Sequence, residues 1–163
     1  MGRMTKEKYG DQYQLHLLEQ YKLYVEMADR ISARRLQTNG FYITLLSGLL
    51  TLLSFLNVDK DQEVHTQNNI FFLVVGVIGL TLCATWLFNI RSFKQINSLK
   101  FKVIHEMEQN LPFPCYSREW EILKQDGSRE KYLRQTKIEQ FIPFILAVPY
   151  CGFILYWLRS LLF

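Results

Sequence analysis

Residues 21–39 read YKLYVEMADRISARRLQTN, and residues 40–57, which follow directly, read GFYITLLSGLLTLLSFLN. The first stretch alternates charged and apolar residues, whereas the second contains no Asp, Glu, Lys or Arg. A helix of about 20 apolar residues is long enough to cross the hydrocarbon core of a bilayer. The junction at Arg34–Arg35 therefore predicts a membrane boundary, with a helix in water on one side and a membrane span on the other.

Two further uncharged runs follow, at residues 64–90 and 140–158. A chain of 163 residues has too few polar residues to hide three such helices inside one soluble core. We therefore expect an all-α integral membrane protein with three transmembrane helices, and with amphipathic helices packed as a cytoplasmic layer. The expected order is a cytoplasmic amphipathic helix at 1–39, a first span at 40–57, a short extracytoplasmic loop at 58–69, a second span at 70–90, a cytoplasmic helical region at 91–139 and a third span at 140–160.

The distribution of charge predicts the orientation. Residues 1–35 hold seven Lys and Arg against five acids, and residues 91–139 hold ten against seven, whereas residues 58–63 hold one Lys against three acids. Because basic segments stay on the cytoplasmic side, the N-terminus is expected in the cytoplasm and the C-terminus on the other side of the membrane. The first apolar run begins about 40 residues into the sequence, which does not fit a cleaved signal peptide.

Two charged segments show helical periodicity outside the spans. Apolar residues recur at intervals of three or four from residue 12 to 39 and again from residue 90 to 111, where Lys94, Glu106 and Glu108 are expected on the polar face. The two apolar stripes can cover each other, either within one subunit or between two. A short helix after Pro114, capped by Ser117, is expected to pack onto them through Trp120. The residues expected to pack this cytoplasmic layer are Tyr21, Val25, Ala28, Ile96, Val103, Met107 and Trp120.

Small residues line one face of each of the first two spans. Such faces let membrane helices approach closely. They indicate either packing of the first span on the second within one subunit, or contact between subunits or a pore wall. If the first face is a subunit interface, Gly48→Leu is expected to break the assembly. The two rows are Thr44, Ser47, Gly48 and Thr51 in the first span, and Gly76, Gly79 and Cys83 in the second.

No pattern in the sequence predicts catalysis. His16, His65 and His105 are scattered and none has metal-ligand spacing, and no phosphate-binding glycine loop or nucleophile motif is present. We therefore expect no enzyme activity, cofactor or metal, and no nucleic acid partner. The basic and aromatic residues at the ends of the spans are expected to hold the chain at the membrane interface and to contact anionic lipid head groups. These interface residues are Arg34, Arg35, Arg91, Lys94, Trp157 and Arg159.

Three stretches carry a family resemblance. They are YKLYVEMADRISARRLQTNGFY at 21–42, NSLKFKVIHEMEQNLP at 97–112 and KIEQFIPF at 137–144. Together they resemble the RipA family of octameric bacterial inner-membrane proteins, over roughly residues 18–150. The resemblance implies a homo-oligomer, an octamer, and no catalytic residue. The order of a lead-in helix, two spans and a trailing helix is also similar to SLATT-type membrane effector domains, which implies a pore-forming role in antiviral defence.

These observations leave two hypotheses for function. In the first, the protein is a ring-forming membrane effector that opens or disrupts the membrane when a cytoplasmic protein or nucleotide signal arrives. In the second, it is a non-conducting oligomeric scaffold that recruits a cytoplasmic partner. The small-residue faces and amphipathic helices serve both hypotheses, since they build an oligomer whether or not it conducts.

Overall fold

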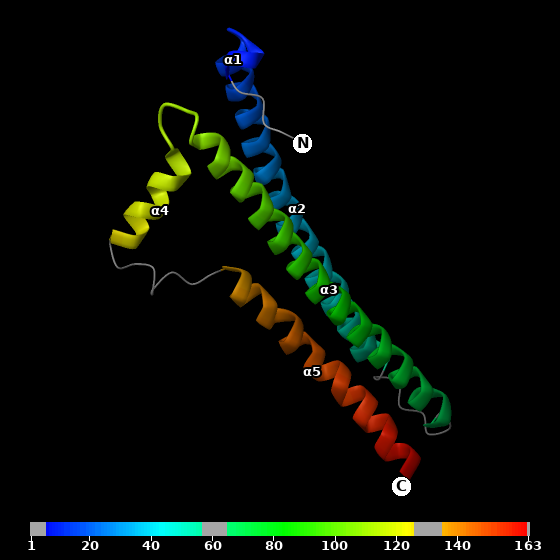
Figure 1. Cartoon of the computed structure of the whole chain (residues 1–163). Coiled ribbons are helices and arrows are strands. Elements are labelled where there is room, and N and C mark those ends of the chain that lie inside the picture. The colour runs from blue at the N-terminus through cyan, green and yellow to red at the C-terminus, as the bar shows by residue number, and fades with distance from the viewer. Residues whose placement is uncertain (1–5, 57–64, 126–134, 163) are drawn as a thin grey trace. The chain divides into compact units, whose positions relative to one another are not determined.

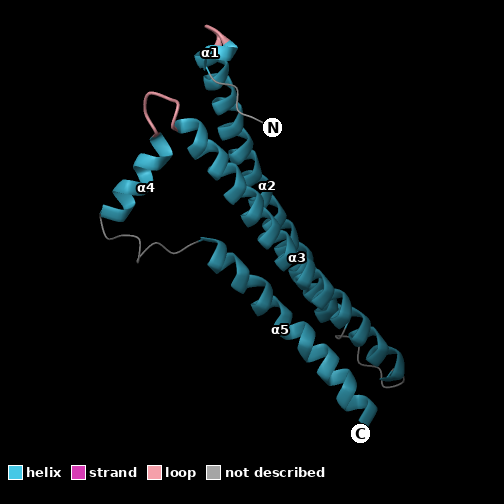
Figure 2. Ribbon diagram, viewed as in Figure 1, coloured by secondary structure: helices cyan, strands magenta, loops and turns pink. Residues whose placement is uncertain are grey.

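The computed structural model describes residues 6–56, 65–125 and 135–162, and within these ranges every regular element is a helix (Figures 1 and 2). Three of the helices are long and apolar enough to cross a membrane. The prediction of an all-α membrane protein with three candidate spans is therefore confirmed. The helices are α1 (Lys6–Tyr9), α2 (Tyr13–Leu56), α3 (His65–Glu108), α4 (Cys115–Gln125) and α5 (Gln135–Leu162).

The helices extend beyond the expected spans. Helix α2 continues without a break through Asn39–Gly40. Helix α3 begins at His65, inside the expected loop 58–69, and α5 begins at Gln135. Pro143 and Pro149 both lie inside α5, which is tolerated in membrane helices when neighbours or side chains satisfy the freed carbonyls. The rest of the expected first loop lies outside the described residues.

The chain divides into two compact units. The first comprises Met1–Arg34 and Phe93–Leu133, and the second comprises Arg35–Ser92 and Arg134–Phe163. The division follows the charge pattern, because the first unit contains the charged amphipathic segments and the second contains the three uncharged runs.

The core of the second unit is formed by α2, α3 and α5. Tyr42 and Trp86 stack with their ring centroids 5.6 Å apart and their planes 9° from parallel. Tyr150 of α5 is fully buried, and its hydroxyl donates to the Leu46 carbonyl oxygen of α2 at 2.7 Å. Tyr150 thus ties the third candidate span to the first. The buried core residues are Tyr42, Leu46, Leu53, Val75, Cys83, Trp86, Ile90 and Tyr150.

In the first unit, α2 packs on α3. Ala28 of α2 and Ile104 and Met107 of α3 are buried. The Lys100 ammonium lies 4.8 Å from the centroid of the Tyr24 ring, within the range of a cation–π contact. The apolar stripes of the two charged segments therefore cover each other at least partly within a single subunit.

Candidate functional site

The last residue of α3, Glu108, is a buried carboxylate that joins three helices. Only 1% of the residue is exposed. Its Oε1 accepts from the Tyr21 hydroxyl of α2 at 3.1 Å and from the Tyr116 backbone N–H at 2.9 Å. Its Oε2 accepts from the backbone N–H and the hydroxyl of Ser117, both at 3.2 Å. We call Tyr21, His105, Glu108, Tyr116 and Ser117 the Glu108 cluster.

The local sequence explains why a carboxylate is buried here. Pro112 and Pro114 end α3, because proline lacks an N–H and disfavours helix in the residue before it. The Pro114 carbonyl accepts from the Arg118 N–H at 3.0 Å, so α4 starts at Cys115 with its first N–H groups unpaired within the helix. A carboxylate at this end is favoured by these donors and by the helix dipole.

The expectation that Ser117 caps the short helix is wrong. Ser117 lies inside the first turn of α4, and its own N–H and hydroxyl both donate to Glu108. The helix therefore receives its capping acceptor from a different helix. The expectation that Glu108 lies on the polar face of α3 is wrong for the same reason, since the donors of α4 and Tyr21 cover it.

The Glu108 cluster changes the ionisation of its tyrosines. Burial raises the pKa of Tyr21 well above its ordinary value, and the hydrogen bond to the Glu108 carboxylate raises it further. Burial also raises the pKa of Tyr116, with a smaller contribution from the negative charge of Asp29. His105 Nδ1 lies 3.8 Å from Glu108 Oε2, which is too long for a hydrogen bond, and this buried nitrogen has no hydrogen-bond partner.

The raised pKa of Tyr21 predicts a loss of stability in alkali. A folded-state pKa above the unfolded value of about 10 favours the folded state below pH 10, and this contribution is lost as pH rises beyond it. We expect the free energy of unfolding to fall above pH 10, and to fall less steeply in Tyr21→Phe, which has no proton to lose at this position. Thermal melts of both proteins from pH 8 to pH 11.5 measure the difference. Equal slopes for the two proteins would contradict the assignment.

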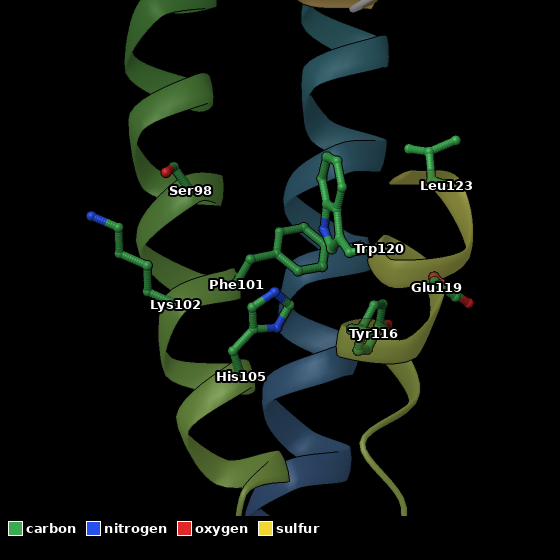
Figure 3. A pocket seen from close by; sticks show the side chains of 8 residues that line it. All are labelled: Ser98, Phe101, Lys102, His105, Tyr116, Glu119, Trp120 and Leu123. Carbon is green, nitrogen blue, oxygen red and sulfur yellow. The ribbon is translucent and has the colours of Figure 1, made fainter. Parts of the chain in front are cut away.

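A cleft lies beside the Glu108 cluster, between α3 and α4. Its volume is about 710 Å³. Figure 3 shows Phe101 and His105 of α3 reaching toward Trp120 and Tyr116 of α4. The Phe101 and Tyr116 rings meet edge to face with centroids 5.5 Å apart. The other lining residues are Ser98, Lys102, Glu119 and Leu123.

Polar side chains that the sequence analysis did not single out pair between the helices of the second unit. The Trp86 indole N–H donates to Asn39 Oδ1 at 2.8 Å, and Asn89 Nδ2 donates to the Tyr42 hydroxyl at 3.0 Å. Arg35, expected as an interface residue, lies with its Nε 3.6 Å from Glu139 Oε2, and both side chains are nearly buried. Since Arg35 directly precedes the first uncharged run and Glu139 the third, the starts of these two runs lie on the same side of the second unit.

The small-residue row of α3 packs against α5. A Cβ placed on Gly76 would lie 2.7 Å from Ile154 Cγ1 and 3.1 Å from the Tyr150 carbonyl oxygen. A Cβ placed on Gly79 would collide with the Tyr150 ring. Cys83 in the same row is buried. This row therefore packs against the third candidate span. One alternative in the sequence analysis was that it packs against the first span of the same subunit.

Among residues 6–56, 65–125 and 135–162, none covers the small-residue row of α2. Thr44, Ser47, Gly48 and Thr51 are all exposed, and a Cβ added at Gly48 meets nothing within 4 Å. The Thr51 hydroxyl donates to the Ser47 carbonyl of its own helix at 2.9 Å. This face is free to contact another molecule.

The remaining residues singled out by the sequence fall into two groups. Tyr21, Val25, Ala28 and Met107 are half-buried or buried inside the first unit, whereas Ile96, Val103 and Trp120 are exposed. Among the interface residues not yet placed, Trp157 is half-buried and four are exposed: Arg34, Arg91, Lys94 and Arg159.

Comparison with known proteins gives one family match. The model of the Octameric membrane protein family (8xMP) matches residues 18–159, which is most of the chain and includes α3 and α4 entirely. No curated protein and no solved structure matches. The resemblance noted in the sequence is confirmed, and the protein is a self-associating, multi-pass membrane protein that belongs to the Octameric membrane protein family.

Proposed function

We propose that this protein forms a ring in the bacterial inner membrane and opens or disrupts that membrane when a cytoplasmic cue arrives. In this proposal the N-terminus lies in the cytoplasm and the C-terminus outside. The excess of Lys and Arg in residues 1–35 and 91–139 supports this orientation. The protein acts by assembly, without catalysis, cofactor or metal.

The uncovered row on α2 is the observation that carries the proposal. Thr44, Ser47, Gly48 and Thr51 lie within an apolar run but are exposed on the subunit. Small and hydroxylated residues of membrane helices ordinarily face other helices or a water-filled path, because lipid tails offer them no partner. A ring of subunits supplies both surroundings, and hydroxyls or a narrow apolar constriction can form a gated path without intramembrane charges.

The Glu108 cluster is our candidate for the point where the cue acts. It joins α2, α3 and α4 through one carboxylate, so a partner that moves α4 must break the bonds from Tyr116 and Ser117 to the same carboxylate that accepts from Tyr21 of α2. A cytoplasmic protein or a nucleotide signal is the class of cue that we propose. The role in phage defence rests on the similarity of this helix order to SLATT-type effectors. Anionic lipid head groups would contact the exposed side chains of Arg34, Arg91 and Lys94, at about 1 kcal/mol each near the surface.

Reconstitution in dye-filled liposomes tests the proposal. We expect the purified oligomer to release the dye when the cue is present, and Ser47→Leu to reduce release by at least tenfold because it fills the small-residue face. Leu45→Phe is the matched control, since Leu45 is exposed on the same helix but lies outside the row. Vesicles that stay tight with the wild-type oligomer, under every protein and nucleotide cue tried, would contradict an effector.

One observation favours the scaffold instead. The hydroxyls of Thr51, Thr81 and Thr85 each donate to a carbonyl of their own helix, at 2.9, 2.8 and 2.9 Å. A hydroxyl that donates to its own helix needs no hydrogen bond to water. Such hydroxyls can therefore lie in a dry subunit interface, and a water-filled lumen is not required. An octameric particle of normal size in permanently tight vesicles would support the scaffold and exclude the effector.

A further inference from the structure

The symmetry of a membrane octamer requires two different contact surfaces on each subunit. Copies inserted in one orientation cannot be related by a two-fold axis in the membrane plane, because that axis would invert half of them. Their ring is therefore cyclic, and each contact joins one surface of a subunit to a different surface of its neighbour. In an octagon the two surfaces face directions about 135° apart, so they lie on nearly opposite sides of the subunit.

The first unit carries an apolar stripe that the described residues leave partly exposed. Ile96, Leu99 and Val103 follow one another at intervals of three and four on α3, and they are 43%, 54% and 37% exposed. Lipid tails do not explain their exposure, because this unit consists of the charged segments on either side of the uncharged runs. An apolar stripe that is exposed to water favours a contact with another protein.

The α3–α4 cleft lies on the other side of the same helix. At about 100° per residue, Phe101 and His105 lie roughly 160° around α3 from the centre of the stripe. The cleft is lined largely by apolar and aromatic side chains, and Trp120 remains 45% exposed at its edge. An exposed Trp beside a cleft of about 710 Å³ is typical of the residues that contribute most to protein–protein affinity.

We propose that in the ring the Ile96–Leu99–Val103 stripe of one subunit docks into the α3–α4 cleft of the next subunit. The two surfaces satisfy the requirement of the cyclic contact, since they are different, apolar and nearly opposite. The occupant of the cleft is thus a second copy of this chain. This inference concerns the subunit interface alone, so it holds whether the ring conducts or acts as a scaffold.

Paired cysteines test the contact in the assembled protein in detergent. In a background with Cys83, Cys115 and Cys151 changed to Ala, the double variant Leu99→Cys/Trp120→Cys is expected to form, on mild oxidation, a disulfide ladder from dimers up to closed octamers. Each single variant is expected to stay monomeric on the same denaturing gel. A mixture of the two single variants is expected to give dimers only, because each chain then carries one thiol. If the cysteine-free background does not assemble, the buried Cys83 is retained.

A charge in the stripe gives a second measurement. Leu99→Glu is expected to shift the particle from octamer to smaller species in light scattering, whereas Leu15→Glu, at an equally exposed position on α2, is expected to leave its mass unchanged. The inference is overturned if Leu99→Cys cross-links to itself, or if the double variant stays unlinked in an intact octamer. It is also overturned if native mass spectrometry finds a small molecule that Trp120→Ala releases, because the cleft then holds a ligand.

Discussion

Glu108→Ala is expected to lower the free energy of unfolding by about 3 to 5 kcal/mol, because it removes the acceptor for four donors at once. Hydrogen bonds to a charged group are worth roughly 1.5 to 3 kcal/mol each, and buried donors left without a partner add to the cost. The N–H groups of Tyr116 and Ser117 and the Tyr21 hydroxyl lose their partner together. At about 2 to 4 °C per kcal/mol, the midpoint of thermal unfolding should fall by roughly 10 °C.

Two further variants, one at Glu108 and one at an exposed glutamate, separate the effect of charge from that of the buried hydrogen bonds. Glu108→Gln keeps the size of the side chain but replaces one acceptor oxygen by a donor, so we expect about half of the alanine effect. Glu19→Gln, on an exposed part of α2, removes one charge and is expected to change the midpoint by less than about 1 °C. Hydrogen exchange gives the local measurement, since amides 115–118 should exchange at least tenfold faster in Glu108→Ala. Unchanged exchange there would show that the carboxylate does not hold α4.

Gly79→Leu is expected to prevent the normal packing of α5 on α3 and to abolish the octameric particle. Even a Cβ at this position collides with the ring of Tyr150, which is fully buried and tied to the Leu46 carbonyl, so the ring cannot turn away without losing that bond. Overpacking of a filled core costs about 1 to 3 kcal/mol, and a leucine here forces the helices themselves apart. Gly79→Ala is expected to assemble with a reduced melting temperature.

Gly48 provides the matched control, because it is also a glycine in an uncharged run but has open space around it. Gly48→Ala is expected to leave the melting temperature unchanged or raised, since Ala favours helix over Gly by about 1 kcal/mol in water. Light scattering of the purified particles gives the assembly state, and a melt in the same detergent gives the stability. A normal octamer from Gly79→Leu would contradict the packing of α3 on α5. A normal octamer from Gly48→Leu would show that the α2 row is not a subunit interface.

The sequence alone determined the class of protein and its helices. Three uncharged runs beside charged amphipathic segments admit few arrangements, because an apolar helix of about 20 residues needs lipid or a large core around it. Periodicity also predicted that Tyr21, Val25, Ala28 and Met107 are packing residues. These features could be predicted because hydrophobicity and helical spacing are local properties of the chain. They do not depend on which helix packs against a given face.

Only the tertiary structure decided which partner each face has. From the sequence, Glu108 is expected on the surface because it is charged. The donors that bury it belong to residues 21, 116 and 117, which the local pattern around Glu108 does not reveal. The two small-residue rows are likewise equivalent in the sequence. In the structure, the Tyr150 ring fills the space beside Gly79, whereas a Cβ on Gly48 would meet nothing within 4 Å. Periodicity shows that a face needs a partner but not which helix supplies it, because that choice depends on the complementary shape and donors of residues far away in the chain.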